Sequence, residues 1–312
     1  MATVAFLVHP ARPEATSLAQ RSVDWLSARG HQARLLTLGD WDRVTENGET
    51  TPLAEVDLSG CDIGVSLGGD GTFLRLVPMA WRTQVPIFGV NLGHLGYLLE
   101  ISPEQLSATL EQALDGRLEI DERAALSVKV SGELTLADAD DRSVRAPASS
   151  ALADGRDEGG GRWWLALNEV VTEKTVPGHT VRLGTSIDGE PYLSYGADGL
   201  LVATATGSTA YNLSAGGPIL VPQLRAMVVT PVAPHLASGH SLVLGAEQSI
   251  TVAVLEGGRP AVLVIDGQEV GRLAPGAEIT CSLAEAPVRL LGSGGRGFAP
   301  LLRSLLGPNR PR

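Results

Sequence analysis

Residues 65–75 read Val-Ser-Leu-Gly-Gly-Asp-Gly-Thr-Phe-Leu-Arg and carry the clearest chemical signal in the chain. An apolar strand pattern over residues 63–67 runs into three glycines around Asp70, and a helix-like apolar run begins at Phe73. Glycines between a strand and a helix let a ligand approach the backbone, and the N–H groups of such a turn bind anions. A carboxylate repels phosphate, so Asp70 fits this loop if it handles a metal ion or the proton of a hydroxyl group. The alternative is a tight turn in which Asp70 caps the helix.

Two other segments suit a nucleotide. Asn168 and Glu169 follow an apolar strand pattern. An amide can read a base edge while the adjacent carboxylate accepts hydrogen bonds from ribose hydroxyls. Residues 204–209 end a strand in Thr-Ala-Thr-Gly-Ser-Thr, and we expect Ser208 or Thr209 to cap a short helix beside a phosphate or nucleoside. Each segment has a plainer alternative, a solvated strand end for the first and a well-capped helix for the second.

The remaining candidates are weaker. Asp266-Gly267-Gln268, between two strand patterns, predicts a hairpin turn. The only lysines, Lys129 and Lys174, do not complete a Gly-x-x-x-x-Gly-Lys frame, which excludes a Walker-type site. The sequence has no His, Cys and carboxylate cluster with zinc spacing and no Gly-x-Ser-x-Gly elbow. We therefore expect phosphate chemistry at residues 68–72.

Composition indicates a globular protein that binds neither nucleic acid nor membranes. The 312 residues are long enough for two domains, and 44% are hydrophobic. A net charge of −11 without a basic cluster argues against nucleic acid and anionic membranes as partners. Cys61 and Cys281 lie far apart, residues 1–10 lack the basic segment of a secretory signal, and no run approaches about 20 apolar residues. We therefore expect reduced thiols and a cytoplasmic location.

The elements that must position these residues change character near residue 120. Strand patterns at 4–8, 32–38, 63–67 and 85–90 alternate with helix patterns at 16–29, 73–77 and 103–114. This alternation predicts a doubly wound, parallel α/β sheet. Ligands bind beyond the carboxyl ends of such strands, where residues 68–72 and 91–96 both fall.

Short strands and turns predict an all-β domain after residue 120. The expected strands are 125–130, 163–173, 180–187, 199–203, 227–231, 242–244, 250–255, 261–265 and 278–283. Residues 137–161 are rich in Ala, Asp, Ser and Gly, and we expect a mobile hairpin there without a function. A strand at 288–291 and a helix at 298–306 are expected to return to the first domain. We therefore predict an α/β domain of residues 1–121 plus 286–312 and a β-rich domain of residues 122–285.

Taken together and in this order, the motifs closely resemble the NAD kinase family over nearly the whole chain. The resemblance rests on residues 68–72, 89–98 (Gly-Val-Asn-Leu-Gly-His-Leu-Gly-Tyr-Leu), 168–169, 198–199 with 206–211, and 266–268. It implies an N-terminal Rossmann-like α/β domain, a C-terminal all-β domain and a nucleotide cleft between them. It also implies transfer of the γ-phosphoryl group of ATP, or of polyphosphate, to the 2′-hydroxyl of the adenosine ribose of NAD, which makes NADP. Mg²⁺ on the phosphates and a homodimer or homotetramer formed through the β domain belong to the same resemblance.

The resemblance also implies roles for individual residues. Asp70 matches the proton acceptor, Gly68, Gly69, Gly71 and Thr72 match the phosphate loop, and Arg75 matches a further ATP-binding position. The positions that match contacts with NAD are Asp70, Gly71, Asn168, Glu169, His179, Asp198, Thr209, Ala210, Tyr211, Asn212, Leu213, Ser214 and Gln268. Phosphoryl transfer through a loose transition state depends on positioning and Mg²⁺, so a base that accepts the proton late suffices.

Three positions depart from the family pattern. Ala205 stands where the family usually has proline, which loosens a turn but removes no ligand group. Residues 238–241 read Ser-Gly-His-Ser in place of Ser-x-Arg-Pro, which puts an arginine contribution there in doubt. Gly196 stands where some members carry a bulky or charged residue, and the room it leaves predicts that NADH is accepted as well as NAD.

Two other functions stay open at this point. A Gly-Gly-Asp-Gly motif also occurs in diacylglycerol-kinase-like and phosphofructokinase-like enzymes, so a lipid or sugar kinase of the same superfamily is one alternative. Residues 168–169 and 206–211 argue against it, because they have NAD kinase spacing. A non-catalytic NAD(P)-binding sensor is the other alternative. Asp70 argues against a sensor, which needs no proton acceptor, whereas the changed segment 238–241 argues weakly for it.

Overall fold

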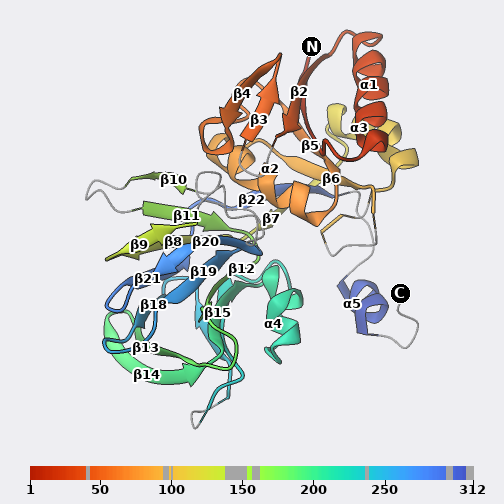
Figure 1. The fold of residues 1–312 in the computed structure, drawn as a ribbon. Helices are drawn as coiled ribbons and strands as arrows, with labels where there is room; N and C mark the ends of the chain where they lie inside the picture. Colours follow the sequence, from red (N-terminus) through yellow and green to blue (C-terminus); the bar gives the residue numbers. More distant parts are fainter. Residues whose placement is uncertain are drawn as a thin grey trace.

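The computed structural model describes residues 1–39, 43–93, 98–99, 101–137, 153–156, 162–235, 239–292 and 298–306, and every structural statement below concerns these residues. They form an α/β domain and a second domain of β strands (Figure 1). The predicted fold class, an α/β domain joined to a β domain, is confirmed.

An eight-stranded sheet forms the centre of the α/β domain, in the order β4-β3-β2-β1-β5-β6-β22-β7. Its parallel strands are β1 (Thr3–Val8), β2 (Gln32–Leu38), β5 (Ile63–Gly68), β6 (Ile87–Asn91) and β22 (Val288–Gly292). The antiparallel edge strands are β3 (Arg43–Glu46), β4 (Glu49–Pro52) and β7 (Glu119–Arg123). The sequence patterns predicted the parallel centre but not these edges, because short polar strands lack a long apolar run.

Helices cover both faces of this sheet. Phe6 of β1 packs in one hydrophobic cluster with α1 (Pro13–Ser27) and α3 (Leu106–Leu114). Leu7 points to the opposite face and packs in another cluster with α2 (Asp70–Thr83). Helix α1 begins at Pro13 rather than at residue 16 as predicted, because the first helical turn needs no N–H from proline. Two single 3₁₀ turns, η1 (Leu53–Glu55) and η2 (Pro103–Gln105), complete the connections.

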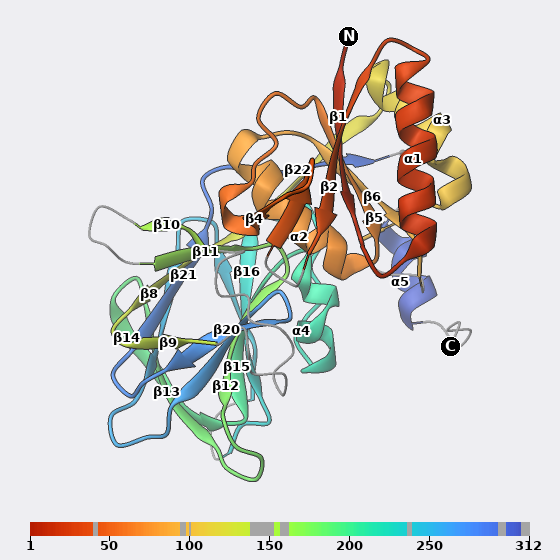
Figure 2. The same cartoon turned by 45° about the horizontal axis from the view of Figure 1, so that its top comes forward.

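Two seven-stranded sheets pack face to face in the second domain (Figure 2). The first sheet has the order β10-β11-β8-β21-β18-β13-β14, with β8 (Leu126–Ser131), β10 (Ala153–Arg156), β11 (Arg162–Ala166), β13 (Val181–Ile187), β14 (Glu190–Ala197), β18 (Ser249–Val254) and β21 (Glu278–Leu283). The second has the order β17-β16-β15-β12-β19-β20-β9, with β9 (Leu134–Leu136), β12 (Glu169–Lys174), β15 (Gly199–Thr204), β16 (Ala226–Val232), β17 (Leu242–Gly245), β19 (Ala261–Ile265) and β20 (Gln268–Leu273). The inward side chains of both sheets form one buried cluster that includes Trp164 and Cys281.

The predicted single strand over residues 163–173 is wrong. These residues form β11 and β12, which belong to different sheets. The chain changes sheet at Leu167 and Asn168. The backbone N–H groups of Leu167, Asn168 and Glu169 donate to the carboxylate of Asp266 at 2.8, 2.7 and 3.0 Å. Since most residues of both strands are buried, the apolar pattern runs across the break and conceals it.

Other strands of the β domain were not predicted either, among them β14 and β20. Both strands carry polar or charged residues among their apolar ones, so their patterns are weak. Most of the predicted hairpin at residues 137–161 lies outside the described residues, and its described part includes β10. The C-terminal helix α5 (Phe298–Leu306) has the predicted bounds.

The two domains share a hydrophobic core. Leu167 lies in the same buried cluster as Phe73 of α2. Trp81 of α2 donates its Nε1–H to the carbonyl of Ala286 at 2.8 Å, and its ring meets that of Trp163 edge to face with 5.8 Å between the centroids. Packing therefore fixes α2 against the end of β11.

Candidate functional site

The glycine-rich loop lies at the carboxyl end of the parallel strands. Strand β5 ends at Gly68 and helix α2 begins at Asp70. Gly69 is the N-cap residue, and its carbonyl accepts the N–H groups of Thr72 at 3.0 Å and Phe73 at 3.1 Å. The alternative in which Asp70 caps the helix is therefore wrong. Its half-buried carboxylate lies instead in the first turn, at the positive end of the helix dipole.

Close packing at the loop requires glycine. A Cβ atom at Gly68 would collide with the side chain of Thr72. Thr72 is 2% exposed, and its Oγ1 has no hydrogen-bond partner among the described residues. Because buried hydroxyl groups are normally hydrogen-bonded, this oxygen is a candidate contact for a ligand at the loop.

Arg75 lies one turn further along α2 and reaches back to the loop. Its Nη1 donates to the carbonyl of Gly71 at 2.9 Å, and the residue is 7% exposed. Burial lowers the pKa of the Arg75 guanidinium, which still keeps its charge at neutral pH. A buried cation beside a helix N-terminus favours an anionic ligand.

Two basic residues that the sequence patterns did not single out border the same edge of the sheet. His9 follows β1, and its backbone N–H donates to the carbonyl of Leu67 at 3.2 Å. The Arg12 side chain donates to the carbonyl of Leu92, just beyond β6. Burial and the charges of Arg12 and Arg75 lower the pKa of His9. Both residues follow a predicted parallel strand, so the rule that ligands bind beyond the carboxyl ends could have found them.

The second predicted loop at this edge is described only in part. The N–H of Gly93 donates to Oδ1 of Asn91 at 2.9 Å, and a Cβ atom at Gly93 would press on the guanidinium of Arg12. Residues 94–97 lie outside the described ranges, so the contribution of residues 94–96 stays a prediction.

Asn168 and Glu169 form a corner where the chain passes from one β sheet to the other. The carbonyl of Asn168 accepts the N–H of Thr204 at 2.9 Å, and a Cβ atom at Gly207 would collide with it. The carboxylate of Asp266 holds the N–H groups of both corner residues. The backbone of the corner is therefore fixed by hydrogen bonds on its carbonyl and on its amide groups.

Two carboxyl groups face each other at this corner. Glu169 is 6% exposed, and burial together with the charge of Asp266 raises its pKa to about 8, although the backbone N–H of Tyr211 favours the ionised form. Burial raises the pKa of Asp266 to about 6, against the effect of its three backbone hydrogen bonds. Burial of both carboxyl groups and their closeness therefore disfavour two negative charges on this pair at neutral pH. Gln268 follows directly as the first residue of β20 and is half-buried.

The hydroxyl groups of residues 206–209 are used within the protein. The Ser208 hydroxyl donates to the carbonyl of Ala205 at 2.6 Å, and the Thr209 hydroxyl donates to that of Thr206 at 3.2 Å. Predicted helix capping by Ser208 or Thr209 is wrong. Both belong to the turn η3 (Gly207–Thr209), and the N-cap of helix α4 (Tyr211–Ser214) is Ala210, without a side-chain cap.

The predicted NAD contacts on α4 differ in exposure. Asn212 is fully buried, its amide group donates to the carbonyls of Ser208 at 3.0 Å and Pro218 at 2.9 Å, and its oxygen accepts from Thr230 at 2.7 Å. Its side chain therefore holds the segment together, and a contact with NAD would have to come from its backbone. The other predicted residues after Thr209 are partly or largely exposed: Ala210, Tyr211, Leu213 and Ser214.

His179 and Asp198 lie at the other end of β12 from Glu169. Asp198 pairs with Lys174, the last residue of β12, at 2.6 Å. Lys174 is about 17 Å from Glu169 at the usual rise of a strand. His179 is exposed in the loop after β12. Burial raises the pKa of Tyr211, and the charges of Glu173, Asp198 and Glu169 raise it further, so carboxylates from both ends of β12 act on its phenol. An extended ligand that lies along β12 could contact Glu169 at one end and Asp198 at the other.

Side-chain hydrogen bonds join β7 of the first sheet to residues 206 and 223 of the second domain. Arg123 of β7 pairs with Asp121 and donates to the hydroxyl of Thr206 at 3.4 Å. Gln223 donates to Asp121 at 3.3 Å. Helix α4 lies on the side of the β sheets that faces the α/β domain (Figures 1 and 2).

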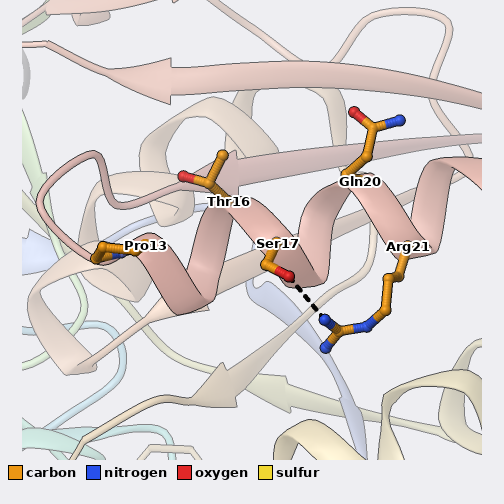
Figure 3. A pocket seen from close by; sticks show the side chains of 5 residues that line it. All are labelled: Pro13, Thr16, Ser17, Gln20 and Arg21. Atoms are coloured by element: carbon orange, nitrogen blue, oxygen red, sulfur yellow. Dashed lines mark hydrogen bonds between the residues drawn. The ribbon is translucent and has the colours of Figure 1, made fainter.

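A separate pocket lies along helix α1. The residues that line it are Pro13, Thr16, Ser17, Gln20 and Arg21, and the Arg21 guanidinium donates to the Ser17 hydroxyl at 2.8 Å (Figure 3). None of the predicted site residues lines this pocket. Within the described ranges, no three His, Cys, Asp or Glu side chains form a metal-binding group. Among the described helices, none has the length and apolar character needed to cross a membrane.

Comparisons with known proteins cover most of the chain. The family model for the ATP-NAD kinase N-terminal domain matches residues 4–118, and the model for the ATP-NAD kinase C-terminal domain matches residues 167–292. The NAD kinase of Heliobacterium modesticaldum is 33% identical over 99% of this chain and 100% of its own length. NAD kinase 1 of Streptomyces coelicolor is 34% identical over 96% of this chain and 84% of its own length.

Solved structures agree in fold. The crystal structure of yeast NADH kinase complexed with NADH has a TM-score of 0.74 at 22% identity and covers 100% of this chain and 89% of its own. The structure of an NAD kinase from Archaeoglobus fulgidus in complex with ATP has a TM-score of 0.70 at 25% identity and covers 97% of this chain and 98% of its own.

Proposed function

Since this chain belongs to the NAD kinase family and phosphorylates NAD with ATP, we propose that the glycine-rich loop binds the donor phosphates and that Asp70 accepts the proton of the ribose hydroxyl. The observation that carries this assignment is the place of Asp70 in the first turn of α2, where Gly69 and not Asp70 is the cap. The carboxylate therefore lies at the start of the helix, beside the amide groups that would hold the donor phosphates. Reactions of this kind depend on positioning more than on a strong base.

The donor side of the site would hold the phosphates of ATP. The glycines 68, 69 and 71 let them approach the helix N-terminus, and Thr72 and the buried Arg75 add a hydroxyl group and a positive charge. These groups favour the negative charge that spreads over the transferred γ-phosphoryl group. Asp70 is an oxygen ligand of the kind that Mg²⁺ prefers, and Mg²⁺ bound with ATP would neutralise part of that charge.

The acceptor side would hold NAD along β12 and α4. We assign Asn168 and Glu169 to the adenosine moiety, with Gln268 beside them. His179 and Asp198 would contact the other part of the dinucleotide, since they lie at the far end of β12. Exposed residues of α4 and backbone groups of residues 209–214 would line the space between.

Three further features are part of this proposal. The domains would comprise residues 1–121 plus 286–312 and residues 122–285, in keeping with the place of β22 in the first sheet. A homodimer or homotetramer would form through the β domain, whose edge strand β14 exposes Tyr192 and Leu193. The two free cysteines agree with a cytoplasmic location.

One assay tests the assignment. The purified protein is incubated with Mg-ATP and NAD, and NADP is measured for the wild type, for Asp70→Asn and for the turn variant Asp188→Asn. We expect Asp70→Asn to abolish NADP formation and Asp188→Asn to leave it unchanged. Normal turnover in Asp70→Asn would refute the role of the carboxylate. Turnover of diacylglycerol or fructose 6-phosphate in place of NAD would favour a related kinase, and binding of NADP(H) without turnover would favour a sensor. The same assay with polyphosphate in place of ATP tests which of the two donates the phosphoryl group.

A further inference from the structure

Two hairpins of the β domain share the same Asp-Gly turn, and they use its carboxylate differently. Asp188-Gly189 joins β13 to β14 with φ of 50° and 84°, and Asp266-Gly267 joins β19 to β20 with φ of 46° and 76°. Both pairs have the positive φ values that a two-residue hairpin requires. The Asp188 carboxylate accepts the N–H of Ser249 at 2.8 Å in an exposed hydrogen bond. Asp266 is 9% exposed and accepts three backbone N–H groups.

The three donors to Asp266 are consecutive residues at a special place in the chain. They are Leu167, Asn168 and Glu169, where the chain leaves one sheet and enters the other. Oδ2 accepts the first N–H, and Oδ1 accepts the second and third. At such a change of sheet these N–H groups need another acceptor, and the ionised carboxylate is a strong one. A hairpin turn alone does not require this arrangement, as Asp188 demonstrates.

We propose that Asp266 is a positioning residue for the recognition of NAD, because its carboxylate fixes the backbone from which Asn168 and Glu169 meet the adenosine moiety. The inference rests on the proposed function, since Asp266 would act through these two residues. The direction of each side chain follows from the backbone that carries it. Recognition by hydrogen bonds tolerates only small displacements of the groups involved, so a loosened corner binds the adenosine less well.

The charge of Asp266 provides a second measurable effect of the same contact, apart from the position of the backbone. Titratable groups that face Glu169 are Asp266 from the hairpin and Tyr211 from α4, and the charge of Asp266 raises the pKa of Glu169. Replacement of Asp266 by asparagine removes that charge. Glu169 should therefore ionise at lower pH in the variant than in the wild type. Replacing a residue far from the corner would not shift the ionisation of Glu169.

The test compares Asp266→Asn with Asp188→Asn in the full-length protein. At pH 9, where Glu169 is largely ionised in both proteins, we expect Asp266→Asn to raise the KM for NAD about tenfold, the effect of one impaired hydrogen bond to a charged group. We expect its KM for ATP and its kcat to stay within about twofold of the wild type, because the glycine loop is untouched. Asp188→Asn should leave both KM values within about twofold. Asp266→Ser, which keeps a short acceptor, should raise the KM for NAD as well. Amide hydrogen exchange at residues 167–169 should be faster in Asp266→Asn than in Asp188→Asn.

Two outcomes would overturn the inference. One is a KM for NAD within about twofold of the wild type in both Asp266 variants. The other is a parallel rise of the KM values for NAD and ATP with a lowered Tm, which would make Asp266 a residue for stability alone. The failure of the proposed function looks different. There, the wild type would not phosphorylate NAD, or Asn168→Ala would leave the KM for NAD unchanged.

Discussion

The buried carboxyl group of Glu169 makes NAD recognition depend on pH in a calculable way. If the ionised group accepts hydrogen bonds from the ribose hydroxyls, the neutral acid binds NAD less well. Burial and the charge of Asp266 raise the pKa of Glu169 to about 8, so most of the free protein carries the neutral acid at pH 7. We therefore expect the KM for NAD to fall as the pH rises from 7 to 9.

The size of the fall follows from the ionised fraction. With a pKa of about 8, roughly one molecule in eleven is ionised at pH 7 and roughly ten in eleven at pH 9. When only the ionised form binds NAD, the affinity rises about tenfold over this range, equivalent to about 1.4 kcal/mol. The glycine loop contains no part of this pair, so the KM for ATP should follow a different and weaker pH dependence.

The assay measures initial rates of NADP formation at saturating Mg-ATP from pH 6.5 to 9.5, with NAD binding measured by calorimetry at the same values. The control is Glu169→Gln, which keeps the shape of the side chain and cannot ionise. We expect its KM for NAD to be nearly constant over this range. A wild-type KM that stays constant or rises between pH 7 and 9 would refute the reasoning. An equal pH dependence in Glu169→Gln would assign the effect to another group.

Four further outcomes are expected from the structure. Because the pKa of Glu169 is raised in the folded protein, the stability gained by burying the neutral acid is fully present below the ordinary pKa of 4.5 and is lost as the pH rises through about 8. Denaturant titration at pH 8.5 should therefore give Glu169→Gln a larger free energy of unfolding than the wild type. Asn212→Ala should lower the free energy of unfolding by about 2–4 kcal/mol, because it leaves buried carbonyls without donors. Trp81→Phe should cost about 1–2 kcal/mol without changing either KM, since it removes the hydrogen bond from α2 to the carbonyl of Ala286. The space beside Gly196 is open, since a Cβ atom there would meet nothing within 4 Å, and this room should let the protein accept NADH. Rate measurements should therefore give a kcat/KM for NADH of no less than about a hundredth of that for NAD.

Much of the fold could be predicted because buried strands are runs of apolar residues in the sequence. Strands β1, β5 and β6 are buried on both faces and appear as apolar runs between turn residues. The strands that escaped prediction, such as β3, β7 and β14, lie at sheet edges or near them and carry polar residues. Edge strands owe their position to pairing with a neighbour, which a pattern along one strand cannot report.

The site was less predictable for a different reason. Asp70 and its glycines are neighbours in sequence, so the loop could be found as a motif. The function of Asp266 depends on donors about a hundred residues away in the chain, and Asp188 has the same local sequence signal without that function. Local sequence identifies the turn but not the direction of its carboxylate. The prediction that Ser208 or Thr209 caps a helix was wrong for a related reason. Their hydroxyl groups donate to backbone carbonyls three residues earlier in the chain.

The shared core explains how two distant segments could act on one pair of substrates. Phe73 follows the glycine loop within α2, Leu167 precedes Asn168, and both belong to one buried cluster. Close packing permits little relative movement between them, so the distance from Asp70 to a ribose held at the corner would be set by this cluster. Since the reaction gains most from positioning, a cavity made by Leu167→Ala should reduce kcat more than a cavity of equal size in the separate core around Trp164. Equal losses of kcat at equal losses of stability would show that the shared core has no special part in positioning.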